Sequence, residues 1–118
     1  MTDQRTTAPP RLPHHKLVAY HLALEMLAAV RAAEIRDPKL RDQAMRAAKS
    51  TALNIAEAAG RVSPADRARV FAIARGEAME AAAGVEIAVI AGDAAEGAFE
   101  ACLPIADRLV ALLTGLCR

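Results

Sequence analysis

One face of a predicted helix in the middle of the chain carries polar groups that could bind an anion or join two helices. These groups follow one another at steps of four, four, three and four residues: Arg46, Ser50, Asn54, Glu57 and Arg61. At 100° per residue their side chains lie within about 80° of one another on a helix. The opposite face of this helix is apolar, so the pattern fits either a solvated surface or a polar contact between helices.

The next predicted helix carries a second polar face, and this one favours the contact between helices. Asp66, Arg69, Glu77 and Glu80 share the face with two isoleucines and with Gly76 and Gly84. A solvated face does not need isoleucine, and glycine inside a helix costs about 1 kcal/mol relative to alanine. We therefore predict close helix packing at both glycines. We also predict a structural polar network, between these helices or across a subunit boundary, formed by Ser50, Asn54, Glu57, Arg69 and Glu80.

Charge is unevenly distributed along the chain, although the total is only +1. Residues 36–75 contain nine Lys/Arg and four Asp/Glu, whereas residues 76–118 contain two Arg and seven Asp/Glu. Such a split arises from solvated helix faces, from complementary neighbours, or from a basic surface for a polyanion. The last option predicts that RNA or DNA binds to a group of cations in the hairpin of the two middle helices: Arg41, Arg46, Lys49, Arg61, Arg67 and Arg75.

Catalytic and metal-binding patterns are weak. Glu77-x-x-Glu80 and Asp93-x-x-Glu96 resemble the acidic spacing of nucleotide pyrophosphohydrolase bundles, which makes a Mg²⁺-dependent hydrolase a second alternative. The second pair lies in a predicted turn, however, where side-chain direction is poorly fixed. His14, His15 and His21 lack the spacing of a metal site. No nucleophile or phosphate-binding motif occurs. The sequence therefore predicts a non-enzyme with no metal, no cofactor and no small-molecule substrate.

Helix signals account for almost the whole chain. Pro13, Asp37-Pro38 and Ser63-Pro64 are typical of helix starts, and Gly60 is typical of a helix end. Apolar residues recur at three-and-four spacing, and no segment alternates as a strand does. Pro104 either kinks the last helix or starts it. The fold class is thus all-α, an antiparallel up-down-up-down four-helix bundle with helices at about 14–33, 38–59, 64–91 and 98–117.

Composition and the chain ends complete the expected organisation. Residues 1–12 have no periodicity and predict a mobile N-terminal tail, followed by one bundle domain over 13–118. The tail lacks the apolar region of a secretory signal, and no apolar stretch is long enough to span a membrane. Cys102 and Cys117 stand alone and are expected to be reduced core residues. These features predict a cytoplasmic protein without a membrane partner.

Several of these segments, in this order, resemble a family of small bacterial proteins, the 23S rRNA-intervening-sequence family. Its pattern Q-x-x-R-A-A-x-S matches residues 43–50, N-I-A-E matches residues 54–57, and G-R matches Gly60-Arg61. Its A-x-G-S-x-x-E pattern ends on Glu80, and K-L-V-A-Y-H-L-A-L resembles its first helix. The similarity runs from residue 12 to about 118. The motif positions in this sequence are Arg46, Ser50, Asn54, Glu57, Gly60, Arg61, Gly76 and Glu80.

The resemblance implies an antiparallel four-helix bundle that assembles into a homopentameric ring, with no established molecular activity. It also implies a distant relation to the accessory variability determinant of diversity-generating retroelements, a basic pentamer that binds nucleic acid and reverse transcriptase. The sequence departs from the pattern at three places: Ala58 replaces a glycine, Glu77 replaces a serine, and Asp37-Pro38 stands where F-P often opens the second helix. The near-neutral total charge departs from the retroelement relative. The leading expectation is a homo-oligomeric scaffold or adaptor whose main partner is itself.

Overall fold

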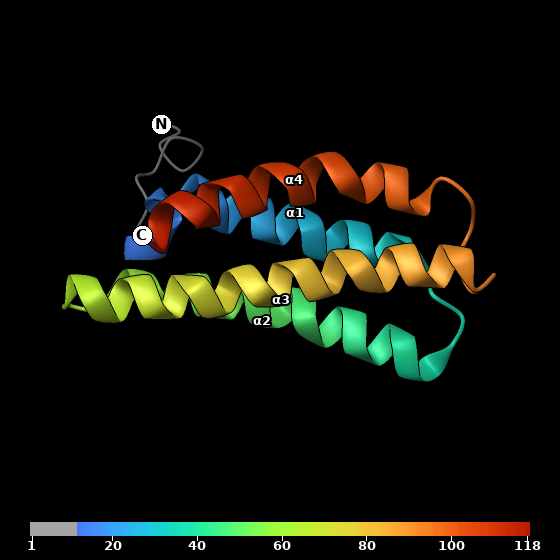
Figure 1. The fold of residues 1–118 in the computed structure, drawn as a ribbon, viewed down its shortest axis with the longest axis horizontal. Coiled ribbons are helices and arrows are strands. Elements are labelled where there is room, and N and C mark those ends of the chain that lie inside the picture. The colour runs from blue at the N-terminus through green and yellow to red at the C-terminus, as the bar shows by residue number, and fades with distance from the viewer. Residues whose placement is uncertain (1–11) are drawn as a thin grey trace, which may run out of the picture.

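The computed structural model describes residues 12–118, which form an all-α bundle without a strand (Figure 1). Successive helices run antiparallel, and α1 packs against α2 and α4, while α3 packs against α2 and α4. The predicted up-down-up-down four-helix bundle is therefore confirmed. Of the tail predicted over residues 1–12, residues 1–11 lie outside the described part. The elements are a short 3₁₀ turn, η2 (Pro13–Lys16), and the helices α1 (Val18–Ala32), α2 (Pro38–Gly60), α3 (Pro64–Ile90) and α4 (Ala98–Leu116).

The two middle helices begin where their capping residues predict. The Asp37 carboxylate accepts a hydrogen bond from the backbone N–H of Leu40, at 2.9 Å. The Ser63 hydroxyl accepts one from the backbone N–H of Asp66, at 3.2 Å. In both cases proline occupies the first helical position, where its missing N–H costs no helical hydrogen bond. α2 ends at Gly60 and Ser63 caps α3, so the connection between these two helices is short and they form a tight hairpin.

The first helix begins later than predicted, at Val18 instead of about residue 14. Pro13 starts only the turn η2, and Leu17 then adopts an extended conformation with φ −91° and ψ 124°. The imidazole of His14 packs edge-on against the Tyr20 ring with 4.5 Å between ring centroids, and η2 also packs against α2. These tertiary contacts explain why the chain turns at Leu17, although local signals favour a continuous helix.

The last helix passes through its proline without starting there. α4 begins at Ala98, after Gly97, whose φ of 95° suits glycine far better than other residues. Pro104 then lies inside the helix and on its exposed side. Of the two alternatives for Pro104, a helix start is therefore wrong.

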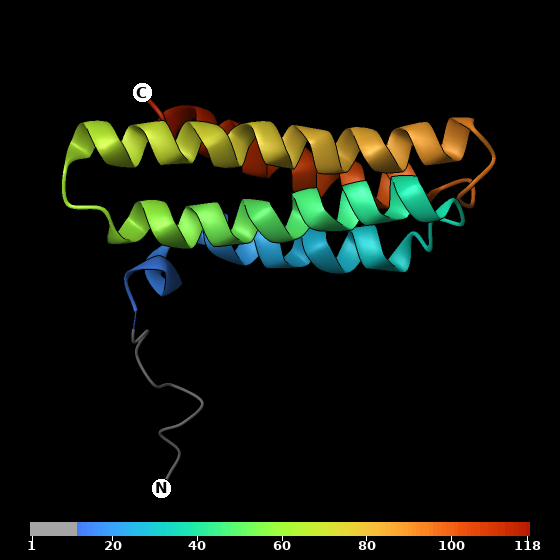
Figure 2. The same ribbon diagram turned by 90° about the horizontal axis from the view of Figure 1, so that it is seen from below.

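The core is built mainly from alanine, which brings α2 and α3 close together (Figure 2). A Cβ added at Gly84 would lie 2.9 Å from the Cβ of Ala44, so α2 and α3 are close together where α3 has no side chain. Cys102 is fully buried, which raises the pKa of its thiol, and both it and the half-buried Cys117 are free thiols. Within residues 12–118, no helix has the length and apolarity needed to cross a membrane. The largest fully buried side chains include Met26, Ile55, Leu109 and Leu113.

Candidate binding surfaces of the bundle

An ion cluster lies at the turn end of the α2–α3 hairpin. Arg61, just after α2, pairs with Glu57 one turn earlier and with Asp66 in the first turn of α3, the latter at 3.2 Å. Arg69 donates to the same Asp66 carboxylate from Nη2 at 2.9 Å and from Nε at 3.2 Å. The three-residue link between the helices places Arg61 beside the first turn of α3, within reach of Asp66.

Arg61 and Asp66, the two central members of the cluster, have shifted pKa values. The hydrogen bond to Glu57, helped by the charge of Asp66, raises the pKa of Arg61 above its already high value. The hydrogen bond from Arg69, together with the charge of Arg61, lowers the pKa of Asp66. Each charge favours the ionised form of its partner. Arg61 and Asp66 are only half-buried, and water screens their charges, so the cluster positions the hairpin end more than it stabilises the fold.

A second polar cluster lies halfway along the hairpin. The Asn54 side-chain amide donates to the backbone carbonyl of Ser50 at 2.9 Å and to its hydroxyl at 3.1 Å. The Ser50 hydroxyl donates to the Glu77 carboxylate of α3 at 3.4 Å, which links the two helices. All three side chains are half-buried. This chain of bonds can fix the register of α2 against α3.

The five residues of the predicted polar network therefore do not form a single cluster within the chain. Ser50 and Asn54 belong to the mid-hairpin cluster, whereas Glu57 and Arg69 belong to the ion cluster at the hairpin end. Glu80 joins none of the hydrogen bonds or ion pairs among residues 12–118. It lies at the edge of a hollow between α2 and α3 near Gln43. Whether the five residues act together across a subunit boundary stays a prediction.

Sequence reasoning missed two members of these clusters, Asp66 and Glu77, as binding partners. Asp66 was identifiable from its place three residues after the cap Ser63 and five after Arg61, across a short turn. Glu77 was predicted on the same face as Glu80, but its partner on α2 depends on the packing register of the helices. Periodicity along one helix does not determine that register.

The two predicted close-packing glycines behave differently. Gly84 is buried against Ala44, in accordance with the prediction. Gly76 is exposed, and a Cβ added there would meet no atom within 4 Å. Gly76 therefore has no close neighbour among residues 12–118, and close packing there against another subunit stays a prediction.

The six predicted nucleic-acid-binding cations are spread over several surfaces. Arg61 is neutralised in the ion cluster, and Arg67 donates to the backbone carbonyl of Arg61 at 3.2 Å. Arg41 donates to the carbonyl of Ile35, and Arg75 points across to the Thr114 hydroxyl of α4 at 2.8 Å. The remaining two, Arg46 and Lys49, lie exposed on the outer side of α2. The fold thus leaves two of the six cations together on one outer face.

The two acidic pairs, Glu77 with Glu80 and Asp93 with Glu96, are not brought together by the fold. Glu77 is bonded to Ser50, while Asp93 lies in the α3–α4 connection, where its carbonyl accepts a hydrogen bond from the backbone N–H of Arg36 at 2.7 Å. Among residues 12–118, no group of three or more His, Cys, Asp or Glu side chains is arranged to hold a metal ion.

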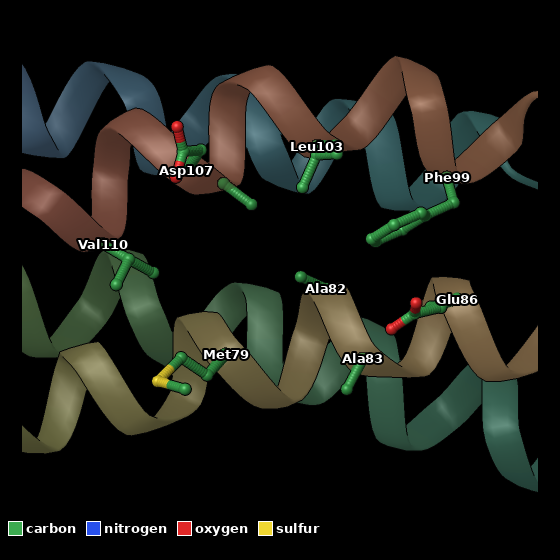
Figure 3. A pocket seen from close by; sticks show the side chains of 9 residues that line it. Met79, Ala82, Ala83, Glu86, Phe99, Leu103, Asp107 and Val110 are labelled. Atoms are coloured by element: carbon green, nitrogen blue, oxygen red, sulfur yellow. The ribbon is translucent and has the colours of Figure 1, made fainter.

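The outer side of α3 carries several exposed apolar side chains around the exposed Glu80, and an apolar groove runs beside it along α4 (Figure 3). We call four residues on this side the α3 strip: Ile73, Met79, Ile87 and Ile90. Each is between 44% and 84% exposed. In the groove, Phe99 and Leu103 of α4 extend toward Ala82 of α3, and the carboxylates of Glu86 and Asp107 lie at its edges. Sequence reasoning singled out Ile73 and Ile87 but not the groove, which depends on which faces of α3 and α4 meet.

Comparison with known proteins gives one match. The family model described as 23S rRNA-intervening sequence protein matches residues 16–115 of the chain. A search of curated proteins found no match. The matched range begins in η2 and ends in the last turn of α4, so it includes every helix of the bundle.

Proposed function

Because the chain belongs to the 23S rRNA-intervening sequence protein family, we propose that it is a non-enzymatic, homo-oligomeric bundle that acts as a scaffold or adaptor. The observation that supports this proposal is the α3 strip, an exposed apolar surface on a folded bundle. The stoichiometry of five copies comes from the family resemblance alone. A cytoplasmic location stays a prediction from the sequence.

The α3 strip is more than a scatter of single exposed apolar residues. Its members lie on one side of one helix, together with the exposed Ala83 and Gly76, and it borders the groove along α4. Large exposed apolar side chains gathered on one side of a folded protein mark interaction sites. Burying it against another copy would release ordered water and favour association by about 25 cal/mol per Å² of apolar surface. A self-associating bundle therefore explains why isoleucine occupies these exposed positions.

The test is a charge placed in the strip and a matched charge placed outside it. Ile87→Asp puts a carboxylate on the outer side of α3, and we expect light scattering to show a shift from oligomer toward the 12.4 kDa chain mass. Val62→Asp is the control, since Val62 is 91% exposed in the α2–α3 turn, outside the strip. Equal masses for Ile87→Asp and the parent protein would refute the role of the strip.

Binding of RNA or DNA is the alternative function, and the positions of the cations support it less. Phosphate binding requires several cations on one face, and most of the predicted set are used within the chain. If nucleic acid binds the hairpin, affinity for a structured RNA must fall with rising salt and in Arg46→Ala and Arg61→Ala variants. Affinity that is insensitive to salt and to both substitutions would exclude this function.

A further inference from the structure

Two opposite faces of the bundle carry apolar side chains with charges of opposite sign. One is the acidic α3–α4 groove, defined by Met79, Phe99, Leu103, Glu86 and Asp107. The other we call the basic α1–α2 face, defined by Leu24, Leu53, Arg31, Arg46 and Lys49. The faces are opposite because α1 packs on α2, α3 packs on α4, and the two pairs are stacked on each other.

The acidic groove has room for a side chain of another molecule. Ala82, Ala83 and Ala106 line it, so little fills the space between Met79 on α3 and Phe99 and Leu103 on α4 (Figure 3). The hollow is about 260 Å³. It is open to solvent along its outer side, so a side chain of another molecule can enter it without a change in the bundle. An apolar side chain flanked by cations would therefore fit it both in size and in charge.

The basic face presents such a side chain. Leu53 is 70% exposed on the outer side of α2, and Lys49 and Arg46 precede it by four and seven residues, so the three lie on one face of the helix. Beside them, a hollow between α1 and α2 is lined by Leu24, Met45 and Arg31.

The named charges on the two faces keep opposite signs when the nearby opposite charge is counted, since three cations outnumber Asp42 on the basic face and two carboxylates outnumber Arg75 at the groove. Asp42, one turn before Arg46, is the carboxylate nearest to the three cations along α2. At one end of the acidic groove, Arg75 is held by the Thr114 hydroxyl. Like charges brought together at an interface cost several kcal/mol, so each face would repel its own kind and attract the other. The total charge of +1 leaves little repulsion between whole copies.

From these features we infer that copies of the chain join head to tail, with α2 of one copy, led by Leu53, seated in the acidic α3–α4 groove of the next. The contact is heterologous, because it joins two different faces, and it generates a ring or an open chain according to the angle between copies. This inference rests on the proposed homo-oligomer and adds which surfaces meet. Nucleic acid at the same cations is the competing occupant.

The test reverses the charges of one face at a time. Glu86→Lys with Asp107→Lys reverses the groove, and Arg46→Glu with Lys49→Glu reverses the opposite face; all four side chains are exposed, so circular dichroism should show an intact fold. We expect self-association of either variant, measured by light scattering, to weaken at least about tenfold. We expect an equimolar mixture to restore complexes that contain both chains, because each reversed face then meets its complement.

Two control variants match the changes in charge at other exposed positions. Glu25→Lys with Glu96→Lys matches the groove variant, and Lys39→Glu with Arg108→Glu matches the α2 variant. Both controls should keep the parent mass. In a further variant, Leu53→Ala should weaken association, whereas Val62→Ala should not.

The possible results distinguish a failure of the head-to-tail pairing from a failure of the proposed homo-oligomer. A monomeric parent chain would overturn the homo-oligomer itself. An oligomeric parent whose mass survives both reversals, or reversed chains that stay apart when mixed, would overturn only the head-to-tail pairing. Loss of RNA binding in Arg46→Glu with Lys49→Glu at unchanged mass would assign these cations to nucleic acid and also overturn the pairing.

Discussion

At the scale of single residues, the two glycines of α3 provide opposite tests of how closely the helices pack. Gly84→Ala should lower the free energy of unfolding by about 1 kcal/mol, because the overlap with Ala44 outweighs the gain in helix propensity. Gly76→Ala should raise it by up to about 1 kcal/mol, since the added methyl meets nothing. Urea denaturation of both variants measures the difference. A Gly84→Ala protein more stable than Gly76→Ala would contradict the close approach of α2 and α3.

The mid-hairpin cluster gives a second test at this scale. Asn54→Ala removes the amide that donates to both the carbonyl and the hydroxyl of Ser50, and it should cost about 1 kcal/mol of stability. A thermal melt of this variant can be compared with that of Lys39→Ala, an exposed change on the same helix that should be near neutral. A melt of Asn54→Ala that matches the parent would show that the cluster does not hold the hairpin.

The ion cluster predicts how stability depends on pH. Since the pKa of Asp66 is lower in the folded chain than in the unfolded chain, its contribution is present above the unfolded value near 4. The contribution is lost as the pH falls through the folded value. As the pH falls below about 4, the parent should therefore lose more stability than Asp66→Asn, as measured by urea denaturation at each pH. Parallel pH profiles for the two proteins would contradict the role of Arg69 and Arg61 as partners of Asp66.

At the scale of the elements, the Ser63 cap sets the residue at which α3 begins. Ser63→Ala removes the cap of α3 and should reduce stability by about 1 kcal/mol, whereas Ser63→Asp keeps a cap and should stay close to the parent. Denaturation curves of both variants test this. Equal losses for alanine and aspartate would mean that the α3 start depends on the tight turn and not on the cap.

The same residues show how far sequence could predict the elements. The Asp37 and Ser63 caps and their prolines are local signals, and the starts of α2 and α3 follow from them. The start of α1 was predicted too early, because the ring of His14 packs against Tyr20 and η2 packs against α2, which are contacts between separate segments. The pairing of Ser50 with Glu77 and the open space at Gly76 likewise depend on the rotation of one helix against its neighbour. Periodicity gives the face of a helix but not this rotation.

At the scale of the whole molecule, the family match extends over all four helices of the bundle. Neither the match nor the fold identifies the partner of the protein, and the exposed surface is the feature that bears on it. A chain of 118 residues buries an alanine-rich core, yet it keeps the α3 strip and Leu53 exposed. Two faces of opposite charge lie on opposite sides of the bundle. Association between copies would explain the α3 strip, the exposed Leu53 and the two charged faces together.

The most direct test of this account is the mass of the parent protein in solution. Light scattering on the eluted peak, over a range of micromolar concentrations at physiological salt, should give a multiple of 12.4 kDa, and five copies if the family resemblance extends to stoichiometry. Higher salt should weaken the assembly, because charge complementarity contributes to it. A mass of 12.4 kDa at every concentration would contradict the central claim that this bundle works as an oligomer.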